Sequence, residues 1–251
     1  MADDKEKLQG AEVKLTSSNK FLSWLDNFWF YHKWKVIIVA FFAVVLTVGI
    51  VQMVKKTDPD VDVTVATHTI YYREQTDALE KMLVGLMPDD LNGDGKKTVQ
   101  LNLYKIYSEN ELKAANEAET DAGGNPVIYA DPAYNKEQIS QYNSYIMTGQ
   151  CSVMILSEYL YNELVNRRTD EILLKPMSEI FGNELPAGVT KDGYGIKLTE
   201  IGAYKNLDGL RFLPDDSVIC IMRPFVTGGN KTAEKHEAAV EYFKNIVLFG
   251  Q

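Results

Sequence analysis

The chain has 251 residues, two cysteines and a formal net charge of −9. Its length allows one sizeable folded domain besides a membrane segment. Residues 57 to 251 carry 18 Lys and Arg against 30 Asp and Glu. This acidic balance argues against nucleic acid as a partner and against close contact with anionic lipid.

The first predicted element is a membrane span. Residues 36–54 are nineteen residues without a charge, bounded by Lys35 and by Lys55-Lys56. A helix of this length measures about 28 Å, which matches the hydrocarbon core of a bilayer. A signal peptide has a shorter apolar core that ends in small residues. The run therefore predicts an uncleaved anchor whose partner is the lipid bilayer.

Residues 1–35 are predicted to be a cytoplasmic tail with an interfacial aromatic segment. All three tryptophans, Trp24, Trp29 and Trp34, fall just before the span, and such rings prefer the headgroup level of a membrane. Basic residues nearly balance across the span, but the tail is short and polar and residues 61–251 contain no second apolar run of this length. We therefore expect a single-pass protein of the cell membrane, with a cytoplasmic N-terminus and an extracellular C-terminal domain.

After a linker at 55–60, strands and helices are predicted to alternate. Residues 61–65 alternate valine with polar residues, which is typical of a strand. Asp131-Pro132 and Ser157 are strong helix starts, because an N-cap oxygen binds the first free N–H groups. The predicted strands are 61–72, 98–107, 151–156 and 217–222, and the predicted helices begin at Thr76, Glu109, Asp131 and Ser157, with a last helix at 231–249.

Two of these strands are almost continuously apolar. CSVMIL (151–156) and SVICIM (217–222) fit strands that are covered on both faces, as in parallel α/β sheets. The sequence therefore predicts an α/β domain over 61–251. Cys151 and Cys220 lie in these strands and are expected to be two separate buried thiols, with a disulfide as the alternative.

A loop after the first helix has the first half of a calcium-binding pattern. Side-chain oxygens of Asp90, Asn92 and Asp94 stand at positions 1, 3 and 5, a glycine stands at position 6, and the carbonyl of Lys96 stands at position 7. Position 12, which should supply a carboxylate, is Leu101, so Asp89 or a carboxylate from elsewhere in the chain would have to substitute. The loop is a candidate weak Ca²⁺ site, and the alternative is an Asn/Asp/Gly turn without a metal.

The order of a helix, MTGQ, CSVMILSE, a second helix and LLKPMSEIFG resembles the type 2 periplasmic solute-binding proteins. The stretch DNFWFYHKWKVIIVAF resembles uncharacterised single-span membrane proteins of Clostridia-type bacteria. The first resemblance implies a reduced type 2 periplasmic-binding-protein-like domain at 61–251, with a ligand cleft that faces strand ends. The chain departs from that family in its shorter length and in its span, and residues 61–251 contain no tryptophan to stack on a sugar.

Residues at strand ends are the candidate ligand-binding residues, because ligands of open α/β sheets bind outside the carboxyl ends of the strands. The alternative for the tyrosines among them is packing at the interface between two lobes. The candidates are His68, Tyr71, Tyr72, Tyr107, Ser157, Glu158 and Arg223.

The expected function is non-enzymatic binding or presentation of a small solute or peptide, with a membrane transporter as a candidate partner. The alternative is a ligand-free envelope scaffold or accessory subunit of a membrane complex, stabilised by calcium. Catalytic motifs such as G-x-S-x-G, H-E-x-x-H and the P-loop are absent from the sequence. A serine or a carboxylate pair within hydrogen-bond reach of His68 would favour a third function, that of an anchored hydrolase.

Overall fold

The computed structural model describes residues 18–55, 59–117, 130–149, 152–167, 173–224 and 229–250. The chain divides into two compact units, residues 1–57 and residues 58–251. Several predictions fall outside the described residues, namely those for Cys151, for the tail before Ser18, for the middle of the linker and for the helix beyond Glu117.

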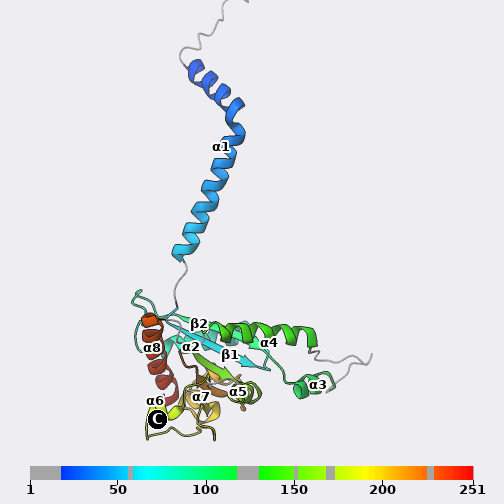
Figure 1. The fold of residues 1–251 in the computed structure, drawn as a ribbon, viewed down its shortest axis with the longest axis vertical. Helices are drawn as coiled ribbons and strands as arrows, with labels where there is room; N and C mark the ends of the chain where they lie inside the picture. Colours follow the sequence, from blue (N-terminus) through cyan, green and yellow to red (C-terminus); the bar gives the residue numbers. More distant parts are fainter. Residues whose placement is uncertain are drawn as a thin grey trace, which may run out of the picture. The chain divides into compact units, whose positions relative to one another are not determined.

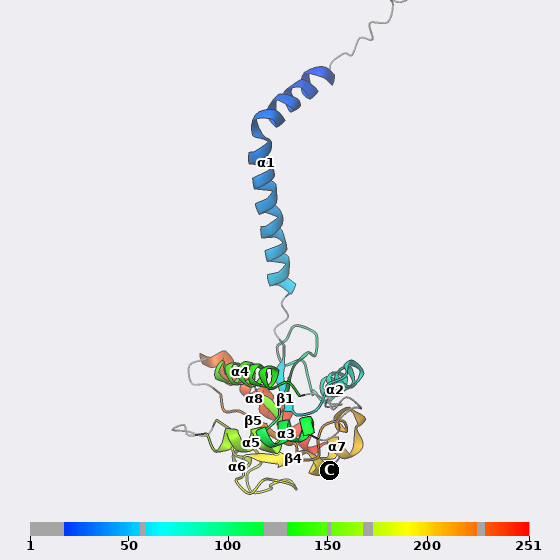
Figure 2. The ribbon, with the colours of Figure 1, turned by 90° about the vertical axis from the view of Figure 1, so that its right-hand side faces the viewer.

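The first unit contains one long helix, α1 (Ser18–Lys55). Its segment Trp24–Val51 is long and apolar enough to cross a membrane, and none of it is buried within the protein. Figures 1 and 2 show one continuous, bent helix, so the expected interfacial helix and the span are parts of a single element. No proline or glycine interrupts residues 18–48, which explains the continuity. Helix α1 is a candidate membrane anchor or signal sequence.

Five strands of the second unit, in the part that the structure describes, form one mixed sheet in the order β2-β1-β3-β5-β4. Strands β1, β2 and β3 are parallel, whereas β5 is antiparallel to both β3 and β4. The strands are β1 (Val61–Thr67), β2 (Val99–Lys105), β3 (Val153–Leu156), β4 (Gly195–Lys197) and β5 (Val218–Ile221).

The prediction that β3 and β5 are buried on both faces is confirmed, because all residues of both strands are buried. The prediction of a parallel sheet is wrong for β5. An apolar composition indicates that a strand is covered on both faces of the sheet, but it does not indicate the direction in which the strand runs.

Helices cover both faces of the sheet, and Figure 2 shows α4 and α2 on either side of β1. One core joins the sheet to α2, α6, α7 and α8, and a second core joins it to α4 and α5. The helices are α2 (Arg73–Gly85), α3 (Glu109–Glu117), α4 (Pro132–Met147), α5 (Glu158–Val165), α6 (Met177–Phe181), α7 (Gly202–Asn206) and α8 (Gly229–Leu248), with two 3-10 turns, Leu198–Glu200 and Asp208–Leu210.

Two predicted helix starts are confirmed by their caps. The Asp131 side chain accepts the N–H of Ala133 at 2.8 Å, and the Ser157 side chain caps α5. The start predicted at Thr76 is wrong, because α2 already begins at Arg73 and the hydroxyl of Thr76 donates to the Arg73 carbonyl inside the helix. Elements α6, β4 and α7 were not predicted, since each is only three to five residues long.

Candidate functional site at the strand edge

The sheet brings four chain segments to one edge. The carboxyl ends of β1, β2 and β3 meet there, since Ala66 pairs with both Tyr104 and Leu156. Leu156 pairs in turn with Val218, the first residue of antiparallel β5. The loops that follow β1, β2 and β3 and the loop that precedes β5 therefore lie at the same end of the sheet. We call this end, where the three parallel strands finish, the strand edge.

His68, Glu111 and Asp216 converge at the strand edge. Their ligating atoms, one from each side chain, all lie within 4.8 Å of one another. His68 Nδ1 is 3.0 Å from Glu111 Oε1, and the two side chains are about one-third exposed. The two side chains are therefore partly open to solvent, although Nδ1 of His68 is itself buried.

Glu111 is held in place by the start of its own helix. Its Oε2 accepts the backbone N–H of Ser108 at 2.7 Å, and the Ser108 hydroxyl accepts the N–H of Glu111 at 3.2 Å. This reciprocal pair is a capping box, in which the Ser at the N-cap and the Glu three residues later satisfy each other's backbone. One carboxylate oxygen is thereby engaged, and the other faces His68.

The ring of His68 stacks on that of Tyr107, with centroids 6.4 Å apart and an interplanar angle of 28°. Asn135 of α4 fixes the backbone of Tyr107 from both sides, accepting its N–H at 2.9 Å and donating to its carbonyl at 3.0 Å. The ammonium of Lys105 lies 5.0 Å from the centre of the Tyr107 ring. The predicted residues His68 and Tyr107 thus come together at the strand edge.

Tyr71 and Ser157 lie at the strand edge as well, but their side chains form hydrogen bonds within the folded chain. The Tyr71 hydroxyl donates to the Tyr104 carbonyl at 3.1 Å and accepts the N–H of Thr67 at 3.1 Å, and burial raises the pKa of Tyr71 to about 12. Ser157 is buried as the cap of α5. Tyr71 is therefore used in packing, whereas the side chains of Tyr72 and Glu158 are exposed.

Arg223 does not join the other candidates. Because β5 runs antiparallel to β3, its last residue, Ile221, pairs with Val153 at the start of β3. Arg223 follows β5 and so lies at the opposite edge of the sheet, where its guanidinium forms an ion pair with Glu179 at 2.8 Å. The expectation that Arg223 lines the same cleft as His68 is therefore wrong, because it assumed that β5 runs parallel to β3.

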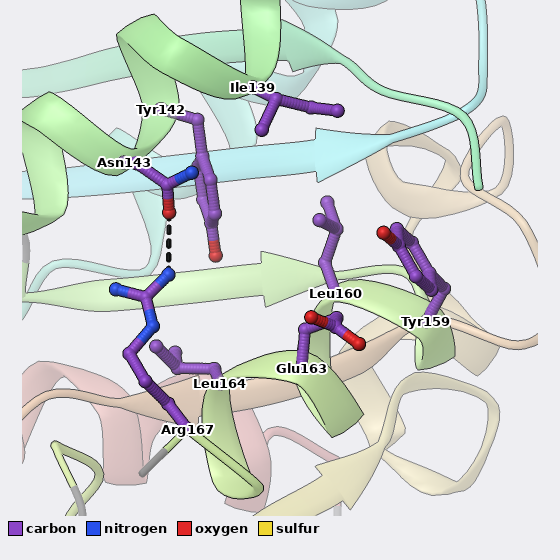
Figure 3. A pocket seen from close by; sticks show the side chains of 8 residues that line it. All are labelled: Ile139, Tyr142, Asn143, Tyr159, Leu160, Glu163, Leu164 and Arg167. Carbon is purple, nitrogen blue, oxygen red and sulfur yellow. Dashed lines mark hydrogen bonds between the residues drawn. The ribbon is translucent and has the colours of Figure 1, made fainter. Parts of the chain in front are cut away.

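A cavity of about 60 Å³ lies between α4 and α5. Figure 3 shows the Arg167 guanidinium reaching across it to Asn143, to which it donates a hydrogen bond. Burial raises the pKa of Tyr159 in the wall, and the charges of Glu163, Glu109 and Glu111 raise it further, which indicates that the cavity neighbours the strand edge. Pockets for small-molecule ligands measure about 300–1,000 Å³, so this cavity admits only a few water molecules.

The candidate calcium loop is shaped by its own hydrogen bonds. Asp90 accepts the N–H groups of Gly93 at 2.8 Å and Gly95 at 2.6 Å, and these bonds hold the pKa of Asp90 below its usual value. Asn92 and Asp94 each accept the N–H two residues further along. These are Asx turns, which need no metal. Calcium binding by Asp90, Asn92, Asp94 and the Lys96 carbonyl stays a prediction.

Glu111 and Asp216 were missed by sequence reasoning. The spacing S-x-x-E from Ser108 to Glu111 is a capping-box signal that could have placed Glu111 at the start of a helix after β2. Asp216 has no such signal, because it reaches the strand edge only through the reversed direction of β5.

A histidine beside two carboxylates suits two kinds of chemistry. It can bind a cation, or a carboxylate can orient the imidazole as a general base. Glu111, 3.0 Å from His68, and Asp216 are the kind of carboxylate pair that would favour an anchored hydrolase, so that alternative stays a prediction. The hydroxyl of Ser217, the residue after Asp216, is fully buried and so is not accessible as a nucleophile. No protein-family model, curated protein or solved structure matches this chain.

Proposed function

We propose that this protein is a single-span membrane protein whose C-terminal α/β unit lies outside the cell and binds a small solute or peptide at the strand edge without catalysing a reaction. The observation that carries the proposal is the convergence of His68 and Asp216, from two loops, with Glu111 from the first turn of α3. Loops at the carboxyl ends of parallel strands are where open α/β sheets place their ligands.

The anchor and the orientation of the chain belong to the same proposal. An apolar helix of 28 residues near the N-terminus is long enough to hold the second unit at a membrane surface. The acidic second unit follows it, and a short polar tail precedes it. The proposed orientation has the tail in the cytoplasm, and a reporter fused after Gln251 that is active only outside the cytoplasm tests it.

The type 2 solute-binding resemblance is also part of this proposal. The capped helix α5 directly after buried β3, and a sheet covered by helices on both faces, support it. In this reading the chain keeps one reduced lobe, and its strand edge would present the solute to a transporter in the same membrane.

Thermal unfolding tests the solute proposal. The full chain in lipid nanodiscs would be melted in EDTA with amino acids, short peptides and sugars, each class at millimolar concentration. Binding to the folded state raises the melting temperature by mass action. We expect one class to raise it and Tyr107→Ala to remove the shift. Tyr134→Ala, at an exposed position on α4, is the matched control. No shift with any class would contradict solute binding.

A second function, a scaffold or accessory subunit of an envelope complex, is favoured by two observations. The cavity beside the strand edge holds only about 60 Å³, and Tyr71 and Ser157 are used by the fold. Calcium would stabilise such a subunit through the Asp90 loop. The test is a Ca²⁺-dependent rise in melting temperature that Asp94→Asn removes and Glu80→Gln, at an exposed position of α2, leaves in place.

A further inference from the structure

We infer that His68, Glu111 and Asp216 form a binding site for a divalent transition-metal ion, and that Zn²⁺ is the ion that fits best. The inference goes beyond the proposed function, because a metal ion can bind whether or not the strand edge takes a solute. Two loops and the first turn of α3 supply one ligand each, and the three ligating atoms lie within 4.8 Å of one another.

The spacing of the ligands suits such an ion. Ligands of a tetrahedral Zn²⁺ lie at about 2.0–2.2 Å from the metal and therefore about 3.3 Å from one another. His68 Nδ1 and Glu111 Oε1 are already 3.0 Å apart. Asp216 is exposed in the loop before β5, so its side chain can rotate to close the remaining distance.

The geometry between His68 and Glu111 favours a metal over a shared proton. Although Nδ1 lies 3.0 Å from Oε1, it is buried and has no hydrogen-bond partner, because the two groups are not aligned. A hydrogen bond requires the N–H to point at its acceptor. A metal ion lies off the line that joins two of its ligands, so a close and misaligned pair is the arrangement that a shared ion produces.

Neighbouring groups hold two of the ligands in place. The Ser108 N–H binds Oε2 of Glu111 at 2.7 Å and leaves Oε1 for the ion. The Tyr107 ring stacks on the imidazole of His68, and Asn135 fixes the Tyr107 backbone. Metal sites depend on such support, since partners outside the coordination shell orient the ligands and change metal affinity by about 10- to 100-fold.

The ligand set selects the class of ion. Imidazole nitrogen suits Zn²⁺ and its neighbours in the first transition row, whereas Ca²⁺ and Mg²⁺ prefer sites made only of oxygen. Three protein ligands leave one position of a tetrahedral ion open. That position would take water or a carboxylate of a bound molecule.

Competition with a chromophoric zinc chelator tests the site. The tag-free full chain in nanodiscs is stripped with EDTA, freed of EDTA and titrated with Zn²⁺. We expect one Zn²⁺ per chain and a loss of affinity of at least tenfold in His68→Ala, Glu111→Gln and Asp216→Asn. Glu111→Gln is the sharpest variant, because glutamine preserves the capping box and removes only the carboxylate.

Glu109→Gln, an exposed position in the same helical turn, is the matched control and should bind Zn²⁺ as the wild type does. Melting each variant in EDTA separates loss of a ligand from loss of the fold. The inference is overturned if the wild type takes up no Zn²⁺ at micromolar concentration, or if the three ligand variants bind it as tightly as Glu109→Gln does. Neither result bears on solute binding, which is measured in EDTA.

Discussion

Thr98, just before β2, donates two hydrogen bonds to one oxygen of Asp60, just before β1. Its backbone N–H is 2.7 Å and its hydroxyl 3.1 Å from Asp60 Oδ2. The other oxygen of Asp60 accepts the N–H groups of Leu91 at 2.7 Å and Asn92 at 2.8 Å. Asp60 is 4 % exposed, so one buried carboxylate joins the starts of two parallel strands to the loop between α2 and β2.

Replacement of Asp60 by Ala is expected to destabilise the protein strongly. The change leaves three partly buried backbone N–H groups without their acceptor, and hydrogen bonds to a charged group contribute about 1.5–3 kcal/mol each. Because these effects overlap, we expect a loss of about 3–5 kcal/mol in denaturant unfolding. Asp89→Ala, at an exposed position, is the control, and an equal effect of the two changes would contradict the role of Asp60.

Gly202→Ala is expected to disturb the packing of α7 against the end of α8. A Cβ at Gly202 would lie 1.7 Å from the carbonyl oxygen of Phe249, so the backbone must move. Overpacking of this kind costs roughly 3 kcal/mol. Gly85→Ala is the matched control, because nothing lies within 4 Å of its Cβ, and alanine favours a helix by about 0.5–1 kcal/mol. Thermal unfolding of both variants tests this prediction, which fails if Gly202→Ala is neutral.

His236 is expected to make the protein less stable in mild acid. Burial lowers the pKa of His236 to about 4 from 6.5, and the charges of Lys175 and Arg223 contribute. Between these two pH values His236 is protonated in the unfolded chain but neutral in the folded protein. Its contribution to the free energy of unfolding is therefore present above pH 6.5 and is lost as the pH falls toward 4. Unfolding free energies at pH 7.5 and 5 should differ less in His236→Leu than in the wild type. Ala233→Gln, an exposed position of α8, should keep the wild-type difference.

Asp90 is also expected to make the protein less stable as the pH falls, but at a lower pH than His236 does. Backbone N–H groups, that of Gly95 above all, hold the pKa of Asp90 below 3.8. Its contribution to stability is therefore present above that value and is lost as the pH falls through the lowered pKa. A carbon-detected NMR titration of the Asp90 carboxyl should give a midpoint below 3.8. A midpoint at or above 3.8 would show that these hydrogen bonds do not favour the charged form.

Local signals predicted most of the longer elements. The caps at Asp131 and Ser157 and the alternating valines of β1 act within a few residues, so the sequence alone places α4, α5 and β1. The region 173–215 contains short helices, 3-10 turns and the three-residue strand β4. Segments this short have no periodicity to read, because their conformation depends on contacts with the rest of the chain.

The sequence predicted two residues of the candidate site, His68 and Tyr107, but not Glu111 and Asp216. His68 and Tyr107 follow strands directly, so a rule about parallel strand ends found them. The same rule misplaced Arg223, because it assumed that β5 runs parallel to its neighbours.

By itself, the sequence determined the apolar helix, the α/β class and the identity of the buried strands, because hydrophobicity and capping are properties of neighbouring residues. Only the tertiary structure decided the direction of β5, and with it which residues lie next to His68. Asp216 lies about 150 residues further along the chain and reaches His68 because β5 enters the sheet from the strand edge. Strand direction depends on how the chain returns to the sheet, which no pattern within the strand encodes.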